Sequence, residues 1–133
     1  MKRYSRQREA ILKLLKQDKT HPDAAQIYLK VKKEIPDISL GTVYRNLKQL
    51  RDDGEIIGFS AGDGFEHFDG NPKPHQHFCC KKCGKISDLY LSTDAVSAAA
   101  EQELKKSGCA EITDTEIFFY GICDSCKQSA YIN

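Results

Sequence analysis

The stretch SLGTVYRNLKQLR, residues 39–51, decides how the first half of the chain folds. Ser39 is a favourable helix N-cap, and apolar side chains follow it with alternating three- and four-residue spacing, as in a helix that buries one stripe. The apolar positions are Leu40, Val43, Leu47 and Leu50. Because the Asp53-Gly54 pair is a stop signal, the sequence predicts one helix between Ser39 and Gly54.

The opposite face of this predicted helix is polar and basic. It presents Thr42, Arg45, Asn46, Lys48, Gln49 and Arg51. Such side chains can donate hydrogen bonds to base edges or phosphates from within a major groove, although most polar helix faces simply contact water. The candidate DNA-contact residues are Ser39, Thr42, Tyr44, Arg45, Asn46, Lys48 and Gln49.

Two helices are predicted before this one and a hairpin after it. The helices are expected over residues 5–17 and 21–31, and the strands over residues 55–60 and 65–68. Proline is favoured near a helix N-terminus, as in His21-Pro22, and residues 61–64 have the composition of a hairpin turn. Three helices followed by a hairpin predict a winged helix-turn-helix domain, here residues 1–69.

Charge is distributed unevenly along the 133 residues, although the formal net charge is only +1. Residues 1–51 carry 13 Lys/Arg against 5 Asp/Glu, net +8, whereas residues 52–133 carry 7 against 14, net −7. A basic N-terminal segment followed by an acidic remainder is expected if only the N-terminal segment contacts the phosphates of a nucleic acid. Chance clustering of solvated charges is the alternative.

The composition is that of a folded protein without a membrane span. Hydrophobic residues make up 40% of the chain and charged residues 29%, and no apolar stretch follows the basic N-terminus. We therefore expect a cytoplasmic protein. In a reducing compartment its six cysteines would bind metal or take part in redox chemistry more often than they would form disulfides.

Two Cys-x-x-Cys pairs give the strongest functional signal, and they follow a predicted hinge over residues 70–74. The pairs are Cys80 with Cys83 and Cys123 with Cys126. Four thiolates in two such pairs supply the tetrahedral set that zinc prefers. Catalytic dithiols need a strand-to-helix context and usually one pair, and the His-x-Glu helix of zinc deaminases is absent. We interpret the pairs as a structural zinc site.

The residues between the two pairs predict an α/β insert. A strand is expected over residues 85–91, a helix over 93–107 and a β-rich run over 115–123. The β-rich run, with its aromatic residues, is a natural dimer surface. The expected fold class is α+β, in which a winged helix-turn-helix DNA-binding domain precedes an α/β dimerisation domain, residues 75–133, with a four-cysteine zinc site.

The histidines indicate a second metal site of different chemistry. In His75-Gln76-His77 the alternation places both imidazoles on one face of an extended strand. With the carboxylates Asp69 and Asp88, histidines form an N/O-rich set that suits Fe2+ or Mn2+ better than a thiolate site does, and solvated loop histidines are the alternative. His67 has no assigned role, and Cys79 and Cys109 are expected to be packing residues.

The chain resembles the ferric uptake regulator family over nearly its whole length. The matching motifs are the Ser5-Arg6-Gln7-Arg8 opening, His21-Pro22, the stretch from Ile38 to Leu47, the run from His75 to Lys85 with its Cys-x-x-Cys-Gly-Lys, and the closing Gly121-Ile122-Cys123-x-x-Cys126. The resemblance implies that the four cysteines hold a structural zinc and that a regulatory metal lies between two domains. Its implied ligands are His21, Asp69, His75, His77 and Asp88.

The same resemblance implies a homodimeric repressor, not an enzyme, that binds a palindromic double-stranded DNA operator with Fe2+ or Mn2+ as corepressor. Within the family, an aspartate at the position of Asp88 resembles the peroxide-sensing branch, whereas iron-uptake regulators usually carry a glutamate at that position. In that branch iron-catalysed oxidation by hydrogen peroxide modifies the histidines that match His21 and His75. The alternatives are an iron- or zinc-level sensor on the same scaffold and, from another class, a zinc-bound thiol oxidoreductase.

Overall fold

The computed structural model describes residues 3–108 and 111–132. The chain divides into two compact units, Met1–Lys73 and Pro74–Asn133. None of the helices in these described residues is long and apolar enough to cross a membrane.

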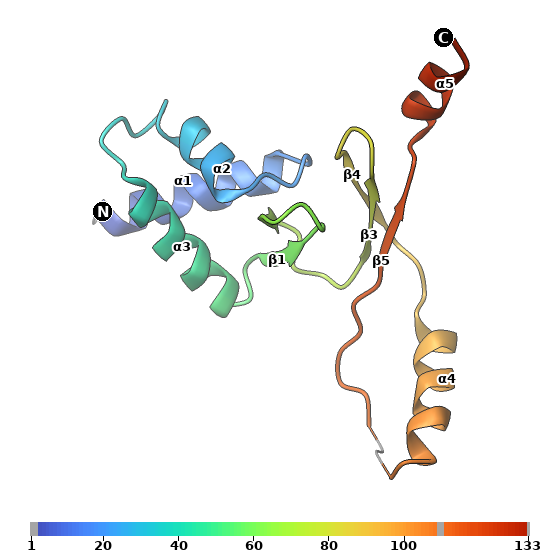
Figure 1. Ribbon diagram of the computed structural model, residues 1–133. Coiled ribbons are helices and arrows are strands. Elements are labelled where there is room, and N and C mark those ends of the chain that lie inside the picture. Colours follow the sequence, from blue (N-terminus) through green and yellow to red (C-terminus); the bar gives the residue numbers. More distant parts are fainter. Residues whose placement is uncertain (1–2, 109–110, 133) are drawn as a thin grey trace. The chain divides into compact units, whose positions relative to one another are not determined.

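The first unit is a winged helix-turn-helix, as predicted (Figure 1). Its elements are α1 (Arg3–Gln17), α2 (Ala24–Val31), α3 (Leu40–Asp52), β1 (Ile57–Ser60) and β2 (Glu66–Asp69). The two strands form an antiparallel hairpin in which Ile57 pairs with Asp69 and Ser60 pairs with Glu66. This hairpin is the wing, and residues 61–65 form its tip.

Side-chain caps fix where α2 and α3 begin. Asp23 accepts from the backbone N of Gln26 at 2.8 Å, and Gln26 Oε1 accepts from Asp23 N at 3.0 Å, which is a capping box. Helix α2 therefore begins at Ala24, later than the His21-Pro22 start that the sequence predicts. Ser39 Oγ accepts from Thr42 N at 3.1 Å, so Ser39 is the N-cap of α3, as expected.

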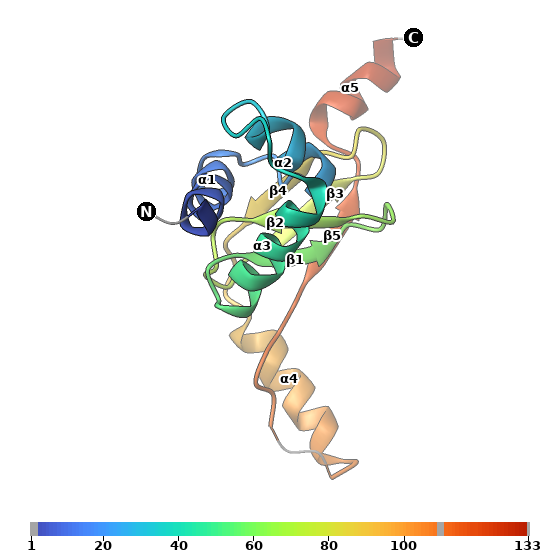
Figure 2. The ribbon, with the colours of Figure 1, turned by 90° about the vertical axis from the view of Figure 1, so that its left-hand side faces the viewer.

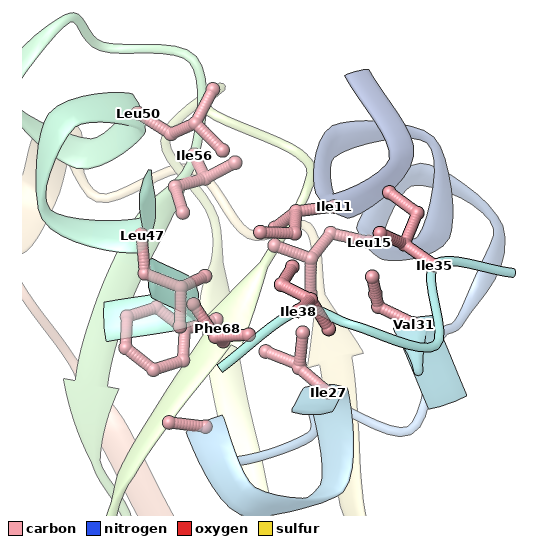
Figure 3. Packing of buried hydrophobic residues seen from close by; sticks show 12 residues of the cluster. Ile11, Leu15, Ile27, Val31, Ile35, Ile38, Leu47, Leu50, Ile56 and Phe68 are labelled. Carbon is pink, nitrogen blue, oxygen red and sulfur yellow. The ribbon is translucent and has the colours of Figure 1, made fainter. Parts of the chain in front are cut away.

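Apolar side chains from all three helices and the wing form one core in the first unit (Figure 3). Its members are Ile11, Leu15, Ala24, Ile27, Val31, Ile35, Ile38, Val43, Leu47, Leu50, Ile56 and Phe68. Each of the larger side chains contributes about 1.5–3 kcal/mol when fully buried. Because α3 and the wing share this core, it fixes their positions relative to each other.

The structure corrects two expectations for α3. Leu40 was expected in the buried stripe, but it is 41% exposed because it is the first residue of the helix and extends past the core. Asn46 was expected on the outer face, but it is only 7% exposed. Its amide Nδ2 donates to Thr42 O at 2.9 Å, so the buried amide has a hydrogen-bond partner.

The second unit is built on a three-stranded sheet with the order β4-β3-β5 (Figure 2). Its elements are β3 (Gln76–Cys80), β4 (Ile86–Leu89), α4 (Asp94–Lys105), β5 (Phe118–Gly121) and α5 (Asp124–Ile132). Strand β3 pairs antiparallel with β4 and parallel with β5. The structure adds α5, a helix that the sequence analysis did not predict.

Parts of the second unit leave apolar side chains exposed. Helix α4 buries none of its residues, and Val96 within it is 55% exposed. Strand β5 is an edge of the sheet formed by the described strands, and Phe119 and Tyr120 are 41% and 48% exposed. Cys79 is buried, as expected, whereas Cys109 lies outside the described residues.

Candidate metal centres and nucleic-acid interface

The four predicted zinc ligands lie together in the second unit. The Sγ atoms of Cys80, Cys83, Cys123 and Cys126 all lie within 4.8 Å of one another. Cys80 Sγ is 3.7 Å from Cys126 Sγ, and Cys83 Sγ is 3.8 Å from Cys123 Sγ. A tetrahedral zinc with Zn–S bonds of about 2.3 Å separates its sulfurs by about 3.8 Å. The sulfur positions therefore fit zinc.

The sheet brings the two cysteine pairs together. In the parallel pairing of β3 with β5, Cys80 is the partner of Gly121, so Cys123 follows two residues beyond the register position of Cys80. After β3 the chain turns back through Gly84, whose φ of 78° is in the left-handed region that favours glycine. Cys83 lies inside this turn, between the ends of β3 and β4.

Backbone donors favour a thiolate within the cluster. Cys80 Sγ accepts from the N–H groups of Cys123 at 3.4 Å and Cys83 at 3.5 Å, and these bonds lower the pKa of Cys80 to about 5. The neighbouring thiols Cys123 and Cys80 raise the pKa of Cys126 to about 12. Without a cation the cluster favours few negative charges, whereas a bound divalent ion would stabilise all four thiolates. This donor chemistry fits a resident zinc.

The first unit brings His21 and Asp69 together. His21 Nε2 lies 3.2 Å from Asp69 Oδ2, and their side chains are 2% and 4% exposed. The ring of Phe59 packs against the His21 ring in an edge contact, with centroids 5.8 Å apart. His21 has a φ of 59°, and it is the only non-glycine residue with positive φ in the described part of the chain. Such conformations are uncommon outside glycine and often mark functional positions.

The second unit brings His75, His77 and Asp88 together. Asp88 Oδ1 lies 3.0 Å from His75 Nε2 and 3.3 Å from His77 Nε2. The pairing of β3 with β4 places His77 opposite Asp88, and the two imidazole centroids are 4.5 Å apart, on one face as the alternation predicts. Three N/O donors converging in this way are suited to a divalent cation such as Fe2+ or Mn2+.

Aromatic rings cover both imidazoles of this second-unit group. Tyr90 stacks on His75 with centroids 5.3 Å apart, and Phe118 stacks on His77 at 5.7 Å. These contacts restrict rotation of the imidazoles, so their Nε2 atoms remain directed toward Asp88.

The sequence indicated no role for His67, but in the structure its side chain has a defined environment. Its Nδ1 lies 2.7 Å from the carbonyl oxygen of His21, and its Nε2 lies 2.7 Å from Asp63 Oδ2. One sequence signal was present, because His67 lies two residues before Asp69 and a strand places such residues on the same face. The contact with His21, 46 residues away, depends on packing that the sequence does not reveal.

The outer face of α3 keeps most of the candidate DNA-contact residues accessible. Ser39, Tyr44, Arg45, Lys48 and Gln49 are exposed and Thr42 is half-buried. A hydrogen-bonded row links Ser39 Oγ to Thr42 Oγ1 at 2.9 Å and Arg45 Nη2 to Thr42 Oγ1 at 3.0 Å.

Two other cations of α3 are paired with acids. Lys48 pairs with Asp52 at 3.3 Å, and Arg51 contacts Glu66 of the wing. The accessible cation nearest the start of α3 is therefore Arg45.

The thiol cluster, the two N/O groups and the polar helix of a winged-helix unit together define a class, the metal-dependent DNA-binding regulators. The chain belongs to the ferric uptake regulator family, whose sequence pattern matches residues 2–120.

Relatives of known name are similar over most of their length. The peroxide-responsive repressor PerR of Staphylococcus epidermidis is 35% identical over 127 residues, which cover 95% of this chain and 82% of that protein. The peroxide stress regulator of Campylobacter jejuni is 31% identical, with a TM-score of 0.74 over 92% of this chain and 90% of that one. The ferric uptake regulator of Francisella tularensis with iron is 28% identical, with a TM-score of 0.75 over 91% of each chain.

Family membership confirms the predicted class of protein. The chain is a metal-dependent transcriptional regulator, and proteins of this family are regulators rather than enzymes. The described residues offer an all-sulfur group of four cysteines and N/O donors from histidines and aspartates, and both kinds of ligand could hold a metal ion.

Proposed function

We propose that the protein is a homodimeric, peroxide-responsive repressor that binds a palindromic operator while Fe2+ or Mn2+ occupies its regulatory site. The proposed regulatory ligands are His21, Asp69, His75, His77 and Asp88, and the proposed zinc ligands are Cys80, Cys83, Cys123 and Cys126. The observation that carries this proposal is the convergence of His75 and His77 on one oxygen of Asp88, at 3.0 and 3.3 Å. Relatives named as a peroxide-responsive repressor and as a peroxide stress regulator support the choice of signal.

One ion held by ligands from both units would make metal binding a conformational signal. Neither group is a complete site alone, because His21 with Asp69 supplies two donors and the group around Asp88 supplies three. Affinity gained only when both groups hold the same ion favours one arrangement of the units. In a dimer, that arrangement sets the distance between two recognition helices and so selects the operator half-site spacing.

The chemistry of the proposed ligands explains a response to peroxide. Fe2+ held by these residues would supply the redox chemistry that activates hydrogen peroxide. The overall change at the protein would be a two-electron oxidation of the ring of His21 or His75, in which one peroxide oxygen is added to the ring, the other leaves as water, and iron undergoes no net change in oxidation state. The oxidised imidazole is a poorer ligand, so affinity for the metal, and with it affinity for DNA, is lost.

The second unit supports the proposed homodimer. Helix α4 buries no residue, and β5 carries exposed aromatic side chains at an edge of the described sheet. Exposed apolar surface and unpaired strand edges are features that a second subunit covers. The dimer would then form between the second units of two chains, and each chain would contribute one winged helix-turn-helix unit.

Peptide mass spectrometry tests the proposed signal. Zinc-containing protein is loaded anaerobically with Fe2+, exposed to a small excess of hydrogen peroxide and digested. We expect one added oxygen on the peptides that contain His21 or His75. Protein loaded with Mn2+ and an iron-treated Asp88→Ala variant are the controls, and neither should be modified. Unmodified histidines despite confirmed iron binding would reject peroxide sensing and favour a regulator that responds to metal concentration.

A further inference from the structure

The side chain of His67 connects two functional parts of the first unit. It is 9% exposed, and its two ring nitrogens lie 2.7 Å from the carbonyl oxygen of His21 and 2.7 Å from Asp63 Oδ2. His21 is a proposed metal ligand, whereas Asp63 lies at the tip of the wing. The ring of His67, which lies on strand β2 of the wing, therefore connects His21 with the tip of the wing.

Both nitrogens of His67 are occupied, so the ring is not itself a metal ligand. A carbonyl oxygen can only accept a hydrogen bond, so Nδ1 donates to His21 O. The carboxylate of Asp63 is also an acceptor, so Nε2 donates as well. Burial acts to raise the pKa of Asp63, but the hydrogen bonds from His67 and from the Phe65 backbone, together with the charge interaction with His67, lower it below its ordinary value.

His21 needs an external restraint because its backbone is in the left-handed region, with a φ of 59°. For a residue with a Cβ this conformation costs on the order of 1 kcal/mol or more. Strand β2 supplies the restraint through His67 Nδ1 and through Phe68 N, which donates to Pro22 O at 3.0 Å. The Phe68 bond fixes the next peptide, and the His67 bond fixes the carbonyl of His21 itself.

The orientation of that carbonyl determines where the His21 side chain points. A rotation of the His21 backbone would move the imidazole away from Asp69 Oδ2, which is now 3.2 Å from Nε2. Metal sites lose affinity when the groups that orient a ligand are removed, even though those groups do not touch the ion.

Asp63 braces His67 from the opposite side. It is held in the wing tip by accepting from Phe65 N at 3.1 Å in addition to its bond with His67. Residues 55–69 contain no Lys or Arg, so His67 is the side chain in this hairpin sequence that can offer a cation to the Asp63 carboxylate.

We propose that His67 is a positioning residue that holds His21 ready to bind the regulatory metal and links that ligand to the wing through Asp63. The proposal rests on the proposed role of His21 as a ligand. It predicts that the two nitrogens of His67 have separable effects, since Nδ1 acts on the metal site and Nε2 acts on the wing.

Two substitutions separate these nitrogens. In His67→Asn the side-chain amide can replace Nδ1, and in His67→Gln it can replace Nε2. Full-length, zinc-containing protein is titrated with Co2+ and the visible absorption of the bound ion is recorded. We expect His67→Gln to weaken Co2+ binding at least about tenfold, the effect of losing one hydrogen bond from a charged donor. His67→Asn should restore affinity to within about threefold of wild type, since the Nδ1-side bond is restored.

Thermal unfolding distinguishes positioning from a general structural role. If both variants lower the unfolding midpoint equally and leave the Co2+ affinity and spectrum unchanged, the positioning role is overturned. His21→Ala is the reference: wild-type Co2+ affinity in that variant rejects the proposed metal site itself. Loss of affinity in His21→Ala combined with normal affinity in His67→Gln rejects only the present inference.

The link to the wing has its own measurement. DNA that wild-type protein selects from a random pool is titrated with Asp63→Ala protein, with and without Mn2+. We expect the gain in DNA affinity caused by Mn2+ to be smaller than in wild type, while Co2+ affinity falls less than in His67→Gln. An unchanged gain would show that Asp63 does not connect the ligand to the wing.

Discussion

The Sγ atoms of Cys83 and Cys123 lie 3.8 Å apart although 40 residues separate them in the chain. Neither residue is held there by a large apolar core, because the second unit buries only a few apolar side chains in its described part, among them Cys79, Cys80 and Ile86. A metal ion that joins the two cysteine pairs would supply the missing stabilisation.

Cys126→Ser is therefore expected to unfold or monomerise the protein. Structural zinc binds with an apparent free energy of about 10–16 kcal/mol in zinc-finger peptides, comparable with the whole stability of a typical domain, about 5–15 kcal/mol. Zinc content and sedimentation velocity check this result. Cys79→Ala is the matched control, since it removes a buried thiol outside the cluster and should retain zinc. A folded, zinc-free dimer of Cys126→Ser would disprove the structural role.

Tyr120→Asp should convert the proposed dimer to a monomer. Tyr120 is 48% exposed on β5, an edge strand of the described sheet, and a buried unpaired carboxylate in an interface is strongly unfavourable. Analytical ultracentrifugation measures the change. The control is Leu29→Asp, which places the same charge at a 64% exposed apolar position in the first unit. Dimers that survive in Tyr120→Asp would exclude β5 from the interface.

The sequence predicted those features of the fold and site that depend on residues only a few positions apart in the chain. The cysteine pairs are such a case, because their spacing alone reports metal chemistry. Asn46 was misplaced because it lies at the border between the buried and exposed faces of α3, where helical periodicity does not decide burial. Its local bond to Thr42 O removes the penalty that usually keeps an amide at the surface.

Longer-range features of the site could not be predicted in the same way. The environment of His67 depends on a contact with His21 across 46 residues, and no periodicity reports such a contact. Helix α5 was missed because its sequence, DSCKQSAYI, has few apolar residues in a repeating stripe.

Arg45→Ala is expected to weaken binding to DNA selected by the wild-type protein by about tenfold or more, since one base or phosphate contact contributes about 1–3 kcal/mol. Arg45 is exposed near the start of α3, and its guanidinium already donates to Thr42 Oγ1. Fluorescence anisotropy at fixed salt measures the affinity, and metal analysis should show unchanged metal content. Lys106→Ala removes a positive charge from the second unit and should leave affinity unchanged. Equal affinities of Arg45→Ala and wild type would remove Arg45 from the reading face.

The loop that leads to His21 should become less stable in acid. Although burial acts to raise the pKa of Asp18, hydrogen bonds from Lys30 and Thr20 outweigh it and hold that pKa below its ordinary value of 3.8. A lowered folded-state pKa means that the ion pair stabilises the fold above about pH 4 and that this contribution is lost as the pH falls through the folded-state value. Because the Lys30 side chain is 46% exposed, solvent screens the pair and its contribution is at most about 1 kcal/mol.

Lys30→Ala tests the cause of this shift. Removal of the lysine should move the pKa of Asp18 upward, which a carboxyl-carbon NMR titration detects directly. Lys33→Ala removes an equal charge from a neighbouring position and should leave the titration of Asp18 nearly unchanged. An unaltered Asp18 titration in Lys30→Ala would show that the lysine does not cause the shift.

Gly70→Ala should destabilise the first unit by about 1–3 kcal/mol, the usual effect of overpacking. A Cβ at this position would lie 2.6 Å from the carbonyl carbon and oxygen of Leu15 and 2.7 Å from Lys16 N, and these backbone atoms at the end of α1 cannot rotate away. Because Asp69 immediately precedes Gly70, the required shift would also weaken Co2+ binding. Chemical unfolding followed by circular dichroism, together with Co2+ titration, measures both effects.

Gly41→Ala is the matched control for this substitution. Its added Cβ meets nothing closer than 3.9 Å, at Arg45 Nη1 and Ser39 Oγ, and alanine is favoured over glycine in a helix by up to about 1 kcal/mol. Replacement of glycine by alanine should therefore stabilise α3 at position 41 and destabilise the segment after β2 at position 70. If Gly70→Ala is as stable as wild type, the close approach of Gly70 to the end of α1 does not limit the position of the neighbouring Asp69.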